Sequence, residues 1–221
     1  SELLHRADEA NAVANYTEAE TLANHALNVI LNSEKTETKQ LSVLHAQALY
    51  VLGVSARRRS NYSTALEYFT QALSVSESVN DQDGIAKATG VIGLVHEALS
   101  DFELALQYYQ KAIELDEKLG NKKREAVWLG FMGNAFANLS NYEHAMEHYN
   151  RSLAIHQEHG NKLGMATNLG NIANLHRVLA DHAKSLEYHE KSLNIYHEIG
   201  DKLGVASSTG NIANVYHSLS Q

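Results

Sequence analysis

The sequence predicts an all-α fold in which antiparallel helix pairs stack into a right-handed solenoid. The 221-residue chain repeats with a period of 40, and residues 160–177 and 200–217 are identical at ten of eighteen aligned positions. A ring side chain recurs at about the same interval, as Tyr62, Phe102, Tyr142 and His182. Because self-similarity at a period of 20–50 residues is typical of stacked-repeat proteins, we expect about eleven helices in about five and a half pairs.

Each repeat is expected to contain a first helix, A, and a second helix, B. In the fourth repeat, apolar residues recur at helical spacing over residues 127–139 and again over residues 142–153. Ser140–Asn141 are good N-cap residues for helix B. Gly160 supplies the left-handed residue that ends helix B, and Asn161 is placed to cap the next helix.

The repeat pattern covers the whole chain, which we interpret as one solenoid domain, 1–221. The repeats are approximately 1–40, 41–80, 81–120, 121–160, 161–200 and a half repeat at 201–221. The first repeat is longer than the others, and we place its insertion near Ser33–Lys39. The half repeat has a helix A with an apolar face in place of a polar cap. We therefore expect the chain to be a fragment of a longer protein, or its last helix to be covered by a partner chain.

Small residues recur in the middle of helix A, at Gly53, Gly93, Gly133, Ala173 and Ala213. A glycine inside a helix costs about 1 kcal/mol relative to alanine, so a packing gain must offset it. We expect these positions to face small residues of helix B, where the two backbones approach closely.

Further positions of the fourth repeat form a known pattern: Leu129, Met132–Gly133, Phe136, Ala145, Tyr149 and Ser152. With this pattern the chain resembles the tetratricopeptide repeat family, in particular the 40-residue variety of Pins-type adaptors and kinesin light chains. Similar arrays also precede catalytic domains in bacterial signalling proteins. The period is 40 rather than 34, and the usual proline at the end of helix B is absent. The resemblance implies helices that are longer by about one turn.

The composition argues against several classes of function. The chain has no Cys, so disulfides, a thiol nucleophile and cysteine-ligated zinc are excluded. It also has no Pro. It contains no run of 18 apolar residues and no signal peptide, so we expect a cytoplasmic protein that does not enter membranes. The net charge of −8 disfavours nucleic acid, because Arg57–Arg59 form a patch and not a basic stripe.

Neither a metal site nor an active site is expected. Thirteen histidines are present, and His144 and His148 have helical spacing. However, sister repeats hold Tyr at the position of His148, so we interpret most histidines as ring-packing residues with lowered pKa values. The glycine pairs near Gly90 and Gly130 lie inside predicted helices, not after a strand, so a phosphate-binding loop is excluded. We expect no cofactor and no catalysis within these residues.

The resemblance implies a ligand groove lined by helix A. Carried onto this sequence, the groove positions are Tyr50, Val54, Arg57, Lys87, Leu94, Phe131, Asn134, Asn171, Asn174, Arg177, Asn211 and Asn214. Carboxamides both donate to and accept from a peptide backbone. Lys87 is the only lysine among these positions, which disfavours a receptor for C-terminal carboxylates. Alternatively, the asparagines are solvated helix residues that repeat duplication has copied.

Three functions are compatible with the sequence. The leading hypothesis is a scaffold that binds a peptide or a partner segment of a protein in the helix-A groove. An alternative is the regulatory or sensor region of a bacterial multidomain signalling enzyme, such as a nucleotide cyclase or histidine kinase. The third is a self-associating module, which forms a homodimer through the uncapped C-terminal helix.

Overall fold

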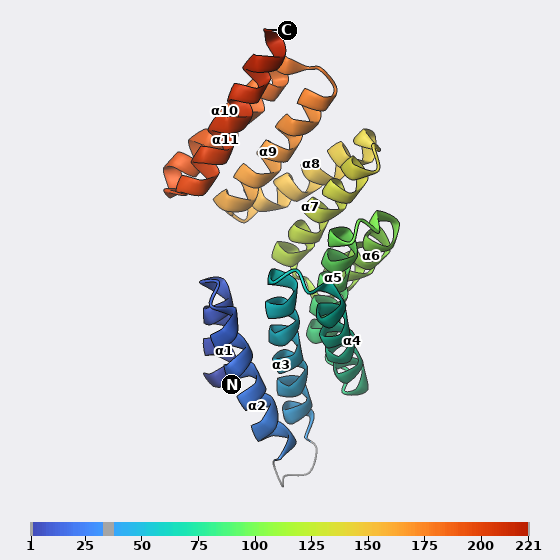
Figure 1. Ribbon diagram of the computed structural model, residues 1–221. Helices are drawn as coiled ribbons and strands as arrows, with labels where there is room; N and C mark the ends of the chain where they lie inside the picture. Colours follow the sequence, from blue (N-terminus) through green and yellow to red (C-terminus); the bar gives the residue numbers. More distant parts are fainter. Residues whose placement is uncertain (1, 33–37, 221) are drawn as a thin grey trace. The chain divides into compact units, whose positions relative to one another are not determined.

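The computed structural model describes residues 2–32 and 38–220, and these residues form eleven α-helices (Figure 1). The helices are α1 (Glu2–Ala12), α2 (Tyr16–Leu31), α3 (Lys39–Arg58), α4 (Tyr62–Ser78), α5 (Gln82–Ala98), α6 (Phe102–Leu119), α7 (Lys122–Asn138), α8 (Tyr142–Glu158), α9 (Lys162–Val178), α10 (His182–Ile199) and α11 (Lys202–Leu219). The predicted all-α repeat of helix pairs is confirmed. The predicted insertion falls mostly on residues 33–37, which lie outside the described residues.

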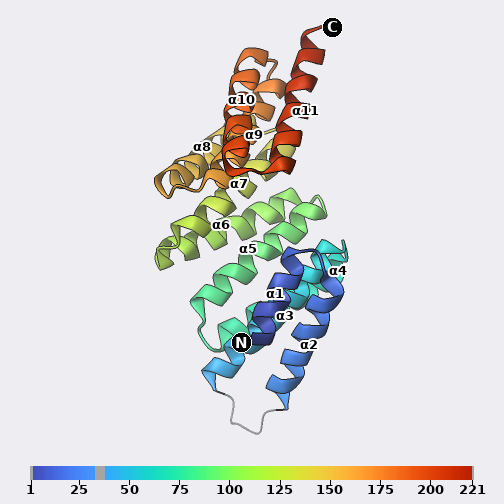
Figure 2. The ribbon, with the colours of Figure 1, turned by 90° about the vertical axis from the view of Figure 1, so that its left-hand side faces the viewer.

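The chain divides into two compact units, residues 1–119 with α1–α6 and residues 120–221 with α7–α11. In both units each helix packs against the next one along the chain (Figures 1 and 2). The odd-numbered helices, which we call A helices, also contact one another: α1 with α3, α3 with α5, α7 with α9, and α9 with α11. The even-numbered helices are the B helices. Whether the two units continue as one solenoid stays a prediction.

The ends of the helices follow the repeated residues. Gly120, Gly160 and Gly200 have φ angles of 69°, 64° and 72°, and they terminate B helices as expected. Asn161 caps α9, because its Oδ1 accepts a hydrogen bond of 3.0 Å from the backbone N–H of Gly164. The turns from A to B contain a feature that the sequence did not reveal. The residue two positions before each B helix is left-handed although it is not glycine: Ala14, Ser60, Ser100, Ser140 and Ala180. The expectation that Ser140 helps to cap helix B is therefore wrong, and Asn141 alone caps α8.

The recurring glycines of the A helices accommodate aromatic rings. A Cβ atom on Gly133 would lie 2.5 Å from the Tyr149 ring, and one on Gly53 would lie 2.5 Å from the Phe69 ring. Gly93 meets Tyr109 in the same way, at 2.7 Å. The expectation that these glycines face small residues is wrong. The space that glycine leaves is filled by a ring, and burial of that ring offsets the helix-forming cost of glycine.

In the fifth repeat, a different pair of residues occupies the positions of the glycine and the aromatic ring. Ala173 takes the place of glycine and His189 takes the place of the aromatic residue, and both are fully buried. Ala173 is larger than glycine by a methyl group, and the imidazole ring of His189 is smaller than the ring of Tyr or Phe. The exchange therefore conserves volume, which cores tolerate well.

Other histidines also replace aromatic rings, as the sequence predicted. His176 stacks on Tyr188 with ring centroids 5.4 Å apart, and His148 stacks on Phe136 at 5.2 Å. A third stack joins His96 to Tyr108 at 5.4 Å. Each stack joins an A helix to the following B helix at the same position of its repeat. In these pairs imidazole acts as a flat packing ring.

Candidate binding surface

The structure distributes the predicted groove residues over the A helices of both units. In the first unit they lie on α3 and α5, and in the second unit on α7, α9 and α11. The side chains of Lys87, Arg177 and Asn214 are exposed, and the other nine are half-buried. We call the face that these residues share within each unit the A-helix surface.

In the second unit, two predicted residues are hydrogen-bonded to each other, and a buried tyrosine bonds one of them. The Oδ1 atom of Asn134 accepts hydrogen bonds from Tyr149 Oη at 2.8 Å and from Asn171 Nδ2 at 3.2 Å. These bonds fix the orientation of both amides. They leave Asn134 Nδ2 as a donor and Asn171 Oδ1 as an acceptor, which is the pair that an extended peptide backbone requires.

The side chains of Asn174, Asn211 and Asn214 form no hydrogen bonds within the residues that the structure describes. Asn174 lies on α9, and Asn211 and Asn214 lie on α11. Each carboxamide therefore keeps both its donor and its acceptor for a ligand or for water.

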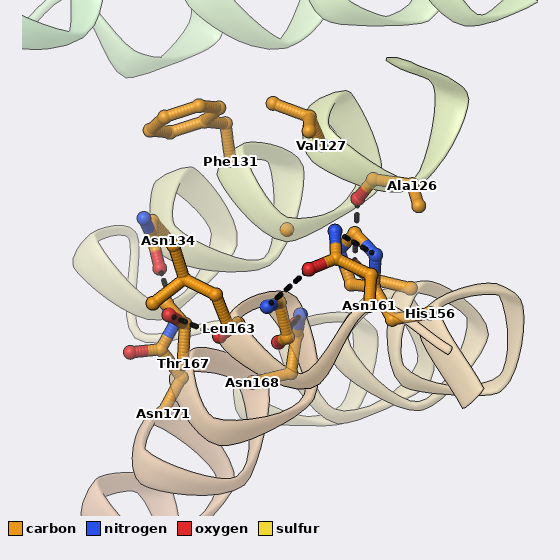
Figure 3. A pocket seen from close by; sticks show the side chains of 13 residues that line it. Ala126, Val127, Phe131, Asn134, His156, Asn161, Leu163, Thr167, Asn168 and Asn171 are labelled. Atoms are coloured by element: carbon orange, nitrogen blue, oxygen red, sulfur yellow. Dashed lines mark hydrogen bonds between the residues drawn. The ribbon is translucent and has the colours of Figure 1, made fainter. Parts of the chain in front are cut away.

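A pocket of about 240 Å³ opens beside Asn134 and Asn171, between α7, α8 and α9 (Figure 3). Its lining includes the predicted residue Phe131 together with residues that the sequence did not single out as ligand-binding: Ala126, Val127, Gly130, Ser152, His156, Asn161, Leu163, Gly164, Thr167 and Asn168. Figure 3 places Val127 and Phe131 on one side of the pocket and Thr167 and Asn168 on the other. The pocket has an apolar wall and several polar groups with fixed orientation.

The protonation of His156 follows from its hydrogen bonds. Asn161 uses its Oδ1 to cap α9, so its Nδ2 faces His156 Nδ1 at 3.2 Å and must donate to it. Nδ1 is therefore an acceptor, and the neutral ring carries its proton on Nε2. Burial lowers the pKa of His156, and the neighbouring His159 lowers it further. The imidazole is thus neutral at pH 7.

The two glycines of the pocket have different roles. A Cβ on Gly164 would lie 2.5 Å from the His156 ring, so only glycine allows this ring to lie flat on α9. A Cβ on Gly130 would make ordinary contacts, 3.6 Å from Ser152 Oγ and 3.7 Å from Asn168 Oδ1. Packing therefore does not require Gly130, and its missing side chain leaves room in the pocket.

The A-helix surface of the first unit carries a different set of groups. Arg57 is half-buried, and burial lowers its pKa, with a smaller contribution from Arg58. Tyr109 donates a hydrogen bond to Glu97. Burial raises the pKa of Glu97, and this hydrogen bond opposes the shift. The predicted groove lysine, Lys87, forms an ion pair of 2.7 Å with Asp83. It is therefore paired with a neighbour on its own helix.

Within residues 2–32 and 38–220, no group of three or more His, Asp or Glu side chains is arranged to hold a metal ion. In the same residues, no helix combines the length and the apolar character that crossing a bilayer requires.

Comparison with known families identifies the repeat. The sequence pattern of the tetratricopeptide repeat matches residues 44–118, 84–158 and 164–221. The chain belongs to the tetratricopeptide repeat family. No match was found among curated protein sequences.

Solved structures with low sequence identity share this fold. BtubC (BKLC) from P. vanneervenii has a TM-score of 0.74 at 20% identity, over 88% of this chain and 78% of that one. A signal transduction ATPase with numerous domains and a tetratricopeptide repeat sensor, from Pyrococcus horikoshii, has a TM-score of 0.82 at 17% identity, over 97% of this chain and 32% of that one. A Rap protein complexed with Competence and Sporulation Factor has a TM-score of 0.70 at 14% identity, over 99% of this chain and 64% of that one.

Proposed function

We propose that this chain is a scaffold that binds an extended peptide segment of a partner protein along its A-helix surface. The observation that carries the proposal is the row of carboxamides from Asn134 to Asn214 in the second unit, beside an open pocket. The family match supports a protein-interaction module. The Rap protein complexed with Competence and Sporulation Factor supports the same class of function through its similar fold.

The carboxamides favour a peptide backbone over a folded protein face. Asn134 and Asn171 present a donor and an acceptor side by side. The hydrogen bond from Tyr149 orients Asn134, and the hydrogen bond to Asn134 orients Asn171. Preorganised polar groups lose little entropy when a ligand binds. Asparagine is a mediocre helix former, so its repeated use in the middle of α7, α9 and α11 requires a compensating role.

The proposal predicts that replacing Asn174 and Asn214 with alanine weakens peptide binding without lowering the melting temperature. Peptides selected from a random displayed library serve as the probe, and fluorescence anisotropy gives Kd. Asn150→Ala is the matched control, because Asn150 is an exposed asparagine on the B helix α8. Unchanged Kd values in N174A and N214A would contradict the assignment of the A-helix surface as the peptide-binding site. Loss of the fold in these variants would also contradict it.

A second candidate is the sensor region of a multidomain signalling enzyme. It is favoured by the TM-score of 0.82 to the Pyrococcus horikoshii protein, of which this chain matches 32%. The discriminating observation is the complete open reading frame. A catalytic domain joined to these repeats would support the sensor role, and a chain that consists of repeats alone would argue against it.

Self-association through α11 is a third candidate. Thr209 and Ala213 are exposed on α11, whereas their counterparts on α9, Leu169 and Ala173, are buried. A second copy could cover this face. The mass in solution, measured by sedimentation equilibrium with and without residues 202–221, distinguishes a dimer that depends on α11 from a monomer.

A further inference from the structure

The pocket beside Asn134 has a counterpart at the next repeat junction, where six of the thirteen lining residues are exchanged, His156 among them. Residues of the pocket align with residues 40 positions later, so that His156 corresponds to Tyr196 and Gly164 to Gly204. A Cβ on Gly204 would overlap the Tyr196 ring, just as a Cβ on Gly164 would overlap the His156 ring. The two rings therefore lie on their glycines in the same way.

The longer phenol of Tyr196 spans the second junction. Its hydroxyl lies 3.3 Å from Thr167 Oγ1 on α9. Thr167 corresponds to Val127, which lines the pocket at the first junction. The ring thus reaches from the glycine to the opposite A helix, across the space that is open at the first junction. The protein itself shows that a phenol fits the corresponding space at the second junction, where Thr167, Asn171 and Ser208 stand in place of Val127, Phe131 and Asn168.

The charge of the pocket restricts its occupant. None of the lining residues is Asp, Glu, Lys or Arg. The only titratable residue among them is His156, whose pKa is lowered by burial. A charged ligand group would lose its hydration without gaining a counterion, which is costly. The pocket therefore selects a neutral side chain.

A polar atom on the pocket wall lacks a partner. Asn168 is 4% exposed, and its Nδ2 donates to the carbonyl of Gly164 at 2.9 Å. Its Oδ1 accepts no hydrogen bond from the described residues. A buried acceptor without a donor is unfavourable, and a ligand hydroxyl would satisfy it. The pocket thus offers an apolar wall for a ring, and the unsatisfied Asn168 Oδ1 lies just beneath its surface as an acceptor for an O–H group that comes within reach.

We propose that this pocket binds the tyrosine side chain of the peptide that occupies the A-helix surface. The proposal rests on the proposed function, because the pocket opens beside Asn134 and Asn171. Its volume of about 240 Å³ suits one ring and is small for a larger ligand. For comparison, an apolar cavity of about 150 Å³ binds benzene.

The first experiment uses p-cresol, the tyrosine side chain as a free molecule. Titration into the 15N-labelled full chain should shift the amide resonances of Gly130 and Gly164 in a saturable way. Toluene, which lacks the hydroxyl, should bind about three- to tenfold more weakly. Absence of saturable shifts at these two glycines would overturn the pocket as a ring site, and equal affinity for toluene would overturn the role of Asn168.

Two reciprocal variants locate the site. His156→Tyr should fill the pocket with the ring that the next junction already contains, and p-cresol binding should be lost while the melting temperature is retained. Tyr196→His should open a second pocket, so that p-cresol also shifts the amides of Gly170 and Gly204. Unchanged p-cresol binding in H156Y, with the fold confirmed by circular dichroism, would contradict the assignment.

Peptide selection separates this inference from the proposed function. Random displayed peptides selected on the wild-type chain should share a tyrosine at one position, and the same library selected on H156Y should lose it. Peptides that depend on Asn174 but show no tyrosine preference would overturn the inference and leave the proposed function standing. If the chain binds p-cresol but selects no peptides, the proposal that the bound ring belongs to a peptide tyrosine is overturned.

Discussion

Replacing Gly133 with alanine should destabilise the protein, although alanine is the better helix former. The new Cβ would lie 2.5 Å from the Cδ1 and Cε1 atoms of Tyr149. Carbon atoms pack best at about 3.5–4.0 Å, so the ring or the helix must move. Tyr149 is buried and its hydroxyl is bonded to Asn134, which leaves it little freedom to rotate away.

The expected magnitude follows from two opposing effects. Overpacking of a core costs about 1–3 kcal/mol. Exchanging glycine for alanine inside a helix contributes about 1 kcal/mol in the other direction. The net loss in the free energy of unfolding should therefore be roughly 0–2 kcal/mol, and the contacts of 2.5 Å with two ring atoms place it in the upper part of this range.

Gly130 provides the control, because it lies on the same helix one turn earlier. A Cβ at Gly130 meets its nearest atoms at 3.6 and 3.7 Å, which are ordinary contacts. Gly130→Ala should stabilise the chain by about 0.5–1 kcal/mol while it reduces p-cresol binding. Gly170→Ala, whose Cβ would lie 3.6 Å from Ser192 Oγ, should stabilise equally without affecting the pocket.

Urea denaturation followed by circular dichroism at 222 nm measures these changes, and equal m-values make the midpoints comparable. The double variant G133A/Y149H copies the Ala173 and His189 pair of the fifth repeat and should recover part of the loss. The explanation that the Tyr149 ring fills the space left by Gly133 is refuted if G133A proves as stable as the wild type. It is also refuted if the double variant loses more stability than the two single variants lose together.

Three further predictions concern stability. Burial lowers the pKa values of His148, His156 and His189, so the unfolded chain binds more protons below about pH 6.5 and stability should fall as the pH decreases from 7.5 to 5.5. His148→Tyr, which copies the sister repeats, should reduce this slope in urea titrations at several pH values, and an unchanged slope would contradict the assignment. Asn161→Ala should cost about 1 kcal/mol by removing the N-cap of α9, and a midpoint equal to wild type would show that the cap contributes nothing. Tyr149→Phe should lower the free energy of unfolding by about 1 kcal/mol through the lost hydrogen bond to Asn134, whereas a gain in stability would argue against that bond.

The sequence predicted the helix pairs and their boundaries well, because a repeat presents the same signals several times. Gly160 and Asn161 end one helix and start the next, and the corresponding residues do so in other repeats. The prediction that histidines act as packing rings is also confirmed, at His96, His148 and His176. Positions that vary between Tyr, Phe and His across the repeats indicate a space that is shaped for a ring.

Contacts between helices were harder to predict. Gly133 was expected to face a small residue, but the same small size also admits the edge of Tyr149. A glycine in a helix indicates a close contact with a neighbouring helix. It does not show whether the contacting group is the backbone or an aromatic side chain. The left-handed Ser60 and its counterparts were missed because serine is not the usual residue for this conformation.

The pocket could not be predicted from the groove positions alone. Its essential residues lie on the junction between repeats, where His156 from α8 meets Gly164 from α9. A signal was nevertheless present. The position of His156 is one of the most variable of the repeat, with Ser76, Asp116 and Tyr196 as its counterparts. A side chain that varies at this position changes the space that remains at the junction.

The most direct test of the account is an NMR titration of the 15N-labelled chain with a peptide selected on it. The account predicts the largest amide shifts on the A helices α7, α9 and α11, near Asn134, Asn171 and Asn211. The largest shifts on the B helices α8 and α10 would contradict it.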